Sequence, residues 1–111
     1  MKKKINRCKE IDMKIPEEIE FMSQTWQIRS ANHKELIDCL GLCDPQTNTI
    51  ILDPGLPDSV MMQTLMHELV HLIEITLNQC LTEGQVDTMA TGIVHLFRAN
   101  PSLLRLIEEQ E

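Results

Sequence analysis

The sequence predicts an α+β fold, with a small antiparallel sheet of three to four strands followed by two or three helices. Between residues 17 and 53, short runs alternate apolar and polar side chains, whereas from residue 60 to about 77 apolar side chains recur every three or four positions. The segment DPGLPDS (53–59) separates these patterns with residues that break helices and strands. A chain of 111 residues can build one core, so we expect a single domain over residues 1–111, with residues 1–14 as a flexible lead-in.

Four segments of the first half are expected to be strands. EEIEFM (17–22) and TWQIRSA (25–31) are separated only by SQ, which indicates a β-hairpin. LGLCD (40–44) and NTIILD (48–53) flank PQT, whose proline and polar residues are typical of a second tight turn. The intervening NHKELIDC (32–39) fits either a short helix or an irregular connection.

The second half is expected to be helical. The first helix runs from residue 60 to about 77, and Asp58 or Ser59 is available to cap it. LTEGQVDTMATGIVHLFRAN (81–100) predicts a second helix, because Thr82 and Gln85 resemble a capping box. A third short helix could begin at the proline that follows. Two apolar stripes are expected to lie in the core: Met62, Leu65, Leu69 and Leu72, then Met89, Ile93, Leu96 and Phe97.

Composition and charge exclude several classes of function. The net charge is −7, and residues 53–111 carry only two basic but nine acidic side chains, so nucleic-acid binding is not expected. No apolar run approaches the roughly 18 residues of a membrane span, and the Lys-rich start lacks the apolar core of a signal peptide. We therefore expect a cytoplasmic protein whose cysteines, which include Cys39 and Cys43, are reduced and mostly buried.

The segment MHELVHLIE (66–74) places two histidines four positions apart in the first expected helix. Residues i and i+4 share one helical face, about 5–6 Å apart at Cβ, so His67 and His71 can direct ring nitrogens at one ion. Glu68 lies about 100° further round the helix, where it can reach a water bound to that ion. This HExxH pattern suits a zinc ion that activates water.

A catalytic zinc takes three protein ligands, so a third must come from another segment. EGQVD, on the second helix, offers Glu83 and Asp87 as another i, i+4 pair. If the link between the helices turns the chain back antiparallel, Glu83 would ligate alongside His71. Asp87 would then accept the second ring N–H of His67 and fix its tautomer.

The spacing leaves other assignments open. Asp87 could be the ligand, with Glu83 an acid that is favoured at a helix N-terminus. Glu74 shares the helical face of the histidines but lies a turn beyond His71, which makes it a poor ligand. His67 and His71 could also be incidental core histidines of a small α+β domain.

The combination of HELVH and EGQVDTMA resembles the gluzincin metallopeptidases, whose pattern is HExxH, then ExxxD, then a small residue three positions later, here Ala90. The compact layout is similar to that of the minigluzincins and of small phage and prophage relatives of the ImmA/IrrE-like peptidases. In those proteins a hairpin and a strand pair precede the first helix, a place that GLCDPQTNTIILDPGLP fills here. The resemblance covers roughly residues 15–100.

This resemblance implies a zincin-like domain that hydrolyses a protein or peptide substrate. It implies one Zn²⁺ per chain, held by His67, His71 and Glu83. Glu68 would be the general base, and Asp87 would be the partner of a ligating histidine. The substrate would lie along the strand at 49–53, as the edge of the sheet beside the cleft.

The chain departs from that family in one respect. Active relatives often use a Tyr or His to stabilise the oxyanion, and this chain has no Tyr. His33, His95 and Arg29 are the remaining candidates. The alternative function is therefore a zinc-binding regulatory module that is catalytically weak or inactive.

Overall fold

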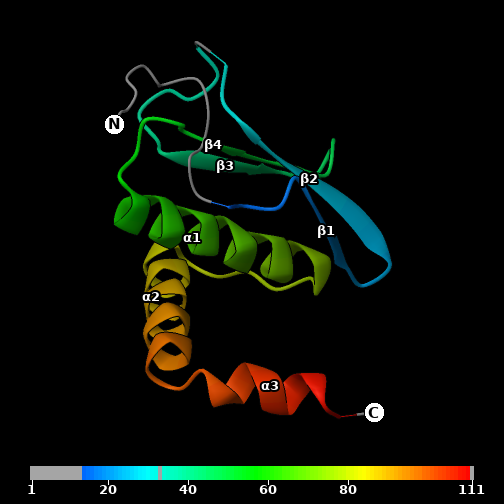
Figure 1. Cartoon of the computed structure of the whole chain (residues 1–111). Helices are drawn as coiled ribbons and strands as arrows, with labels where there is room; N and C mark the ends of the chain where they lie inside the picture. The colour runs from blue at the N-terminus through cyan, green and yellow to red at the C-terminus, as the bar shows by residue number, and fades with distance from the viewer. Residues whose placement is uncertain (1–13, 33, 111) are drawn as a thin grey trace.

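The computed structural model describes residues 14–32 and 34–110, which form a sheet followed by helices (Figure 1). In chain order the elements are β1 (Glu18–Phe21), β2 (Gln24–Ser30), β3 (Gly41–Asp44), β4 (Thr49–Leu52), α1 (Asp58–Thr76), α2 (Glu83–Ala99) and α3 (Ser102–Glu108). The α+β class is therefore confirmed. Cys8, His33 and nearly all of the expected flexible lead-in lie outside the described residues. None of the helices in the described ranges combines the length and apolar content that crossing a membrane requires.

The sheet is mixed, so the expectation of an antiparallel sheet is wrong for one pair of strands. Its order is β1-β2-β4-β3, with antiparallel pairs at β1–β2 and β3–β4 but a parallel pair at β2–β4. The two expected hairpins lie side by side, and Ile28 of β2 is in register with Ile50 of β4. This arrangement places the most apolar strand, TIIL, in the interior of the sheet.

The edge of the sheet is also different from the expected one. We expected the strand at 49–53 to be the edge, but β4 lies between β2 and β3, and all four of its residues are buried. A continuous apolar run without alternation is typical of a strand that is covered on both faces. The edge strand next to β4 is β3, which is only partly buried, and β1 forms the other edge.

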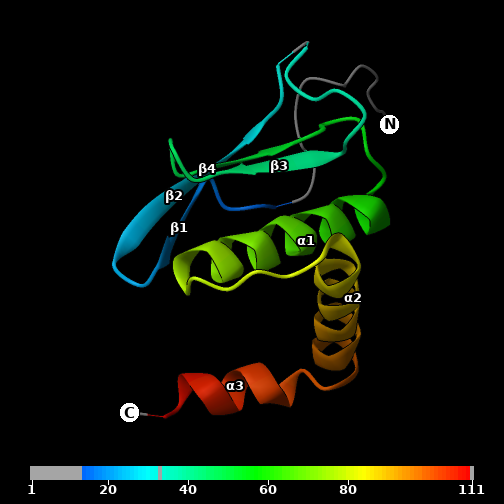
Figure 2. The ribbon, with the colours of Figure 1, turned by 180° about the vertical axis from the view of Figure 1, so that it is seen from behind.

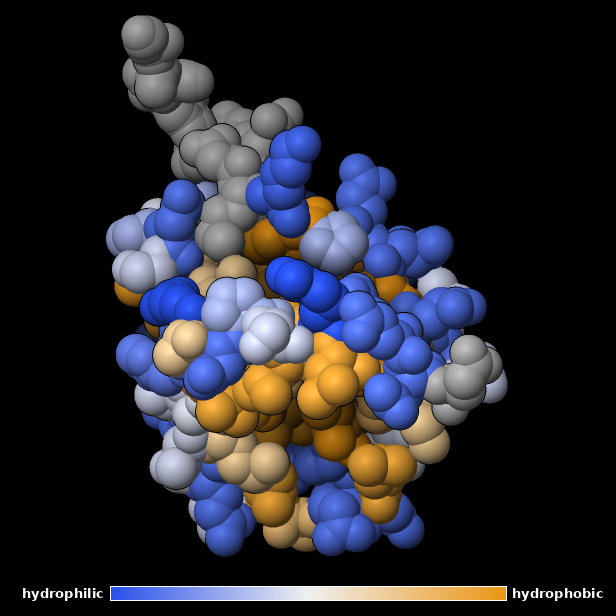
Figure 3. Space-filling view, turned by 60° about the horizontal axis from the view of Figure 1, so that its bottom comes forward, coloured by the Kyte–Doolittle hydropathy of each residue, from blue (hydrophilic) through white to orange (hydrophobic). Residues whose placement is uncertain are grey.

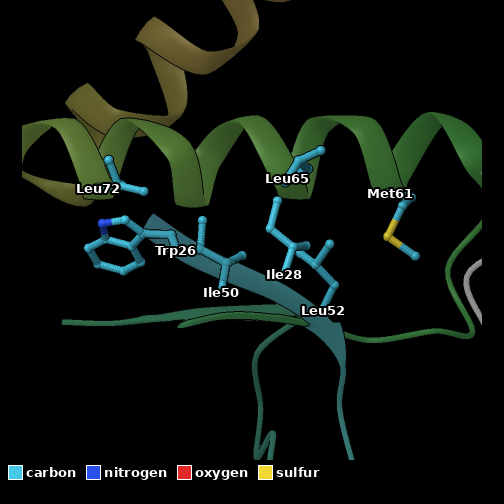
Figure 4. Close-up of a cluster of buried hydrophobic side chains, with 7 residues drawn as sticks. All are labelled: Trp26, Ile28, Ile50, Leu52, Met61, Leu65 and Leu72. Atoms are coloured by element: carbon cyan, nitrogen blue, oxygen red, sulfur yellow. The ribbon is translucent and has the colours of Figure 1, made fainter. Parts of the chain in front are cut away.

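The main core lies between α1 and the sheet (Figure 4). Trp26 and Ile28 of β2 and Ile50 and Leu52 of β4 face the buried side of α1. Seven buried side chains form this cluster: Trp26, Ile28, Ile50, Leu52, Met61, Leu65 and Leu72. The expected stripe on the first helix is therefore confirmed at Leu65 and Leu72, while Met62 and Leu69 are half-buried.

Both ends of α1 are set by backbone geometry. Its N-cap is Pro57, and neither Asp58 nor Ser59 provides the expected side-chain cap. At the other end Asn78 adopts a left-handed conformation, with φ of 61°, and the Gln79 N–H donates to the Glu74 carbonyl at 2.7 Å. This pattern is a Schellman motif, which ends the helix and turns the chain back.

The link after α1 returns along that helix before α2 begins, and α2 then leads away from α1 (Figures 1 and 2). The two helices therefore do not form the expected antiparallel pair. The capping box of Thr82 and Gln85 is confirmed. Only Val86 and Ala90 of α2 are buried, against Val70 of α1, so the second helix packs mainly through its first half.

The expected core stripe of the second helix is wrong for that reason. Met89 is 46% exposed and Leu96 is 51% exposed, while Ile93 and Phe97 are half-buried. Helical periodicity identifies an apolar face, but the neighbour that would cover this face is not supplied by the described part of the chain.

The carboxylate of Glu35 stabilises the connection between β2 and β3. Glu35 accepts hydrogen bonds from Arg29 at 2.5 and 2.8 Å and from the Asn32 N–H at 2.6 Å. The Arg29 bonds, followed by the Asn32 N–H, lower the pKa of Glu35 from its ordinary value of 4.5 to about 2. The described part of segment 32–39 accordingly contains turns and bends rather than a helix.

We expect Glu35→Gln to lower the free energy of unfolding at neutral pH. A group whose pKa is lowered by folding contributes stability above its unfolded pKa and loses it as the pH falls through the folded value. The difference from wild type should therefore shrink between pH 4.5 and about 2, as measured by urea unfolding at several pH values. Glu20→Gln, at an exposed position of β1, is the matched control. A difference that is independent of pH would contradict this account.

Candidate metal centre

His67 and His71 lie side by side on the flank of α1 that lines a cleft together with β3. Their ring centroids are 4.9 Å apart, and both side chains are 19% exposed. A different face of the helix, about 100° round from His71 at Leu72, holds Leu65 and Leu72 in the core, which fixes how α1 is rotated about its axis. The histidine pair therefore has a defined direction, toward the first turn of α2.

Both histidines point one nitrogen at the same carboxylate. The Nε2 atom of His67 lies 3.0 Å from Oε1 of Glu83, and Nε2 of His71 lies 3.0 Å from Oε2 of Glu83. The ligand atoms of these three residues all lie within 4.8 Å of one another, so the group could hold a metal ion. Nitrogen and oxygen ligands about 2.0–2.1 Å from one tetrahedral zinc would be about 3.4 Å apart, close to these separations.

Asp87 contacts the other nitrogen of the first ring. Its Oδ1 lies 3.0 Å from Nδ1 of His67. A proton on Nδ1 donates to this carboxylate and leaves Nε2 directed at Glu83, one turn earlier on α2. Burial lowers the pKa of His67, but the bond to Asp87 and the charges of Glu68 and Glu83 outweigh it, so this pKa is raised. A metal ion would take the place of the proton on Nε2.

Glu74 contacts the imidazole ring of His71, a role that was not predicted from the sequence spacing. Its Oε2 lies 2.6 Å from Nδ1 of His71, and its Oε1 accepts a hydrogen bond of 2.7 Å from the Leu81 N–H. The Leu81 N–H, followed by the bond to His71, lowers the pKa of Glu74, and its side chain is only 11% exposed. The i, i+3 spacing of Glu74 from His71 was a signal that the sequence offered. The hydrogen bond from the Leu81 N–H to Glu74, in contrast, exists only in the folded chain.

Glu68 is a buried acid at the wall of the site. It is 6% exposed, and burial raises its pKa although the charges of His67 and His71 oppose the rise. Gly41 of β3 lies directly against it: a Cβ atom on this glycine would be 3.2 Å from Cγ and from Oε2 of Glu68, and 2.9 Å from Cγ2 of Thr64. Only a glycine lets the edge strand pass this close to the carboxylate.

A cleft of about 550 Å³ lies beside the histidines. Its lining comes from the end of the 31–40 connection, β3, α1 and the first turns of α2: Cys39, Leu40, Gly41, Leu42, Cys43, Val60, Gln63, Thr64, His67, Glu68, His71, Ile75, Glu83 and Asp87. This lining contains five acidic or imidazole side chains, all on helices, and an apolar wall, and it includes no Lys or Arg among the described residues.

Two of the expected oxyanion donors lie elsewhere. His95 is exposed on α2 and does not line the cleft, and Arg29 is paired with Glu35. Cys39 and Cys43 do line it, but Cys39 is exposed and so is Cys80, so the expectation of mostly buried cysteines is wrong. Burial, followed by the charge of Glu68, raises the pKa of Cys43 to about 12, which keeps it a thiol.

No family model matches this sequence. The searches of curated proteins and of solved structures also found no match.

We expect Gly41→Ala to destabilise the protein by about 1–3 kcal/mol, because the new methyl group overpacks Thr64 and Glu68. The measurement is the urea unfolding midpoint. Gly92→Ala is the matched control, because nothing lies within 4 Å of a Cβ atom there and alanine is favoured inside a helix. Equal stability of Gly41→Ala and wild type would show that β3 does not pass so close to Glu68.

We expect Glu74→Gln to weaken binding of a divalent metal ion by the His67–His71–Glu83 group about 10–100-fold, as loss of a hydrogen-bond partner of a ligating histidine typically does. The amide oxygen of glutamine can still accept a hydrogen bond from the Leu81 N–H, but its NH₂ group cannot accept one from Nδ1–H of His71. Competition titration with a fluorescent zinc chelator measures the affinity, and Glu108→Gln on α3 is the control. A lower melting temperature with unchanged zinc affinity would show that Glu74 only stabilises the segment between α1 and α2, through its hydrogen bond with Leu81.

Proposed function

We propose that this chain is a small zinc-dependent peptidase with a zincin-like fold. The observation that carries the proposal is the convergence of ligand atoms from His67, His71 and Glu83 beside the buried carboxylate of Glu68, at the wall of a cleft. Two imidazoles and one carboxylate form a ligand set of catalytic zinc, which keeps a fourth position open. The resemblance of HELVH and EGQVD to the gluzincins, including the small intracellular enzymes of phages, supports the same function.

In this proposal each residue of the site has a separate task. His67, His71 and Glu83 hold the ion, while Asp87 and Glu74 fix the tautomers of the two rings. A bound zinc ion would supply a Lewis acid that polarises a scissile carbonyl and acidifies a water. Glu68 accepts the proton of that water and passes it to the leaving amine. Its raised pKa brings it closer to neutral pH, where a general base is most effective.

The substrate in this proposal is an extended peptide that pairs with β3. The Asp53 N–H donates to the Leu40 carbonyl at 3.0 Å, so residues 40, 42 and 44 form the hydrogen-bonded pairs with β4. The N–H and C=O groups of Gly41 and Cys43 therefore turn toward the open edge of the sheet. A peptide added at this edge would have its backbone next to Glu68, because Gly41 lies against that carboxylate.

A second candidate function is a zinc-binding module without turnover. It is favoured by the described lining of the cleft, which offers no Tyr, Lys or Arg and, within residues 14–32 and 34–110, no histidine besides His67 and His71. With the side chains of the described lining alone, a peptidase on this scaffold would stabilise the oxyanion with zinc and with backbone N–H groups. Removal of one oxyanion donor typically costs about 10²–10³-fold in rate, so such an enzyme would be slow.

We expect Glu68→Gln to retain about one zinc per chain and to lower the rate of hydrolysis by about 10²–10⁴-fold, because the general base is lost. His71→Ala should lose both the zinc and the hydrolysis. The zinc content is measured by inductively coupled plasma mass spectrometry. Hydrolysis is measured by incubating the protein with a proteome-derived mixture of unstructured peptides and identifying the cleavage products by mass spectrometry.

The outcomes of this experiment separate the two candidate functions. Cleavage by Glu68→Gln at the wild-type rate would show that the assigned base is wrong. Wild-type protein that holds zinc but cleaves nothing in the mixture would favour the binding module. Wild-type protein that binds no zinc would contradict both.

A further inference from the structure

The last helix of the described chain lacks a core of its own. α3 has seven residues, none of them buried, and its main contact is with α2. Leu104 is 53% exposed and Ile107 is 62% exposed. Isolated helices shorter than about 12–15 residues are marginal in water, so a helix of this length needs a surface that covers its apolar side chains.

These side chains belong to a larger exposed surface. We call it the apolar patch and define it by six residues at the end of α1, on α2 and on α3: Ile73, Leu77, Met89, Leu96, Leu104 and Ile107. Each is between 38% and 62% exposed. Figure 3, which brings the side of α3 forward, shows apolar side chains gathered around a hollow.

The size of the apolar patch fits a stable protein interface. Its exposed fractions correspond to roughly 600 Å² of apolar surface, at the upper limit of the largest patch on a typical monomer. One side of a standard interface contributes about 800 Å², of which a little over half is apolar. The apolar patch alone therefore supplies the apolar share of one side of such an interface.

We propose that two copies of this chain associate through the apolar patch, with α3 of each copy packed against the hollow of the other. One chain carries both complementary parts, a projecting helix and a recess, so a twofold pair satisfies both and closes on itself. Charge permits this pairing: Arg98 and Arg105, the only basic residues of positions 53–111, lie on α2 and α3, where they reduce repulsion between two acidic chains.

The test is the mass of the full chain in solution, measured by sedimentation velocity over about a hundredfold range of concentration. Wild type should have twice the mass of one chain. Leu104→Glu and Ile107→Glu should each raise the dissociation constant at least tenfold, because a buried apolar contact becomes a buried charge. Ile37→Glu is the matched control, since Ile37 is 76% exposed but lies outside the apolar patch, and it should leave the pair intact.

Three results would overturn the proposal. They are a wild type of single-chain mass at every concentration, an assembly larger than two copies, and a pair that persists in both patch variants. A far-UV circular dichroism spectrum and a melting temperature like those of wild type establish that each variant is folded. None of these readouts depends on zinc or on hydrolysis, so the pairing and the proposed peptidase activity can fail separately.

Discussion

The packing of α1 against the sheet is the constraint on which the other features depend. Trp26 and Leu72 are almost completely buried at this interface, and burying such side chains stabilises by about 1.5–3 kcal/mol each. The packing fixes the rotation of α1 about its axis, so helix geometry alone determines where His67 and His71 point. A residue in the core therefore controls the direction of the candidate ligands without touching them.

The second organising factor is the charge around the two imidazole rings. Glu74, Glu83 and Asp87 each contact a ring nitrogen, and the buried carboxylate of Glu68 lies beside them. Carboxylates gathered this closely repel one another unless positive charge lies between them. Protonated rings can supply that charge, and so can a divalent cation, which explains how an acidic half-chain accommodates such a group.

Local features of this fold could be read from the sequence, but pairings between distant segments could not. HELVH and the Thr82–Gln85 capping box depend on spacings of three or four residues within one helix, and both have the expected local geometry. The parallel pairing of β2 with β4 and the direction in which α2 leaves α1 depend on the paths that the connecting segments take. For the same reason the contact of Glu74 with Leu81 was missed: it exists only after the Schellman turn has folded the link back.

The open edge of β3 has a further consequence, because an unpaired strand edge is also a template for aggregation. The next outward-facing position after Gly41 and Cys43 is Pro45, in the turn that follows the strand. Proline has no N–H group, so the row of donors stops there after two residues. An edge this short can accept one extended guest but offers little to a growing stack of strands.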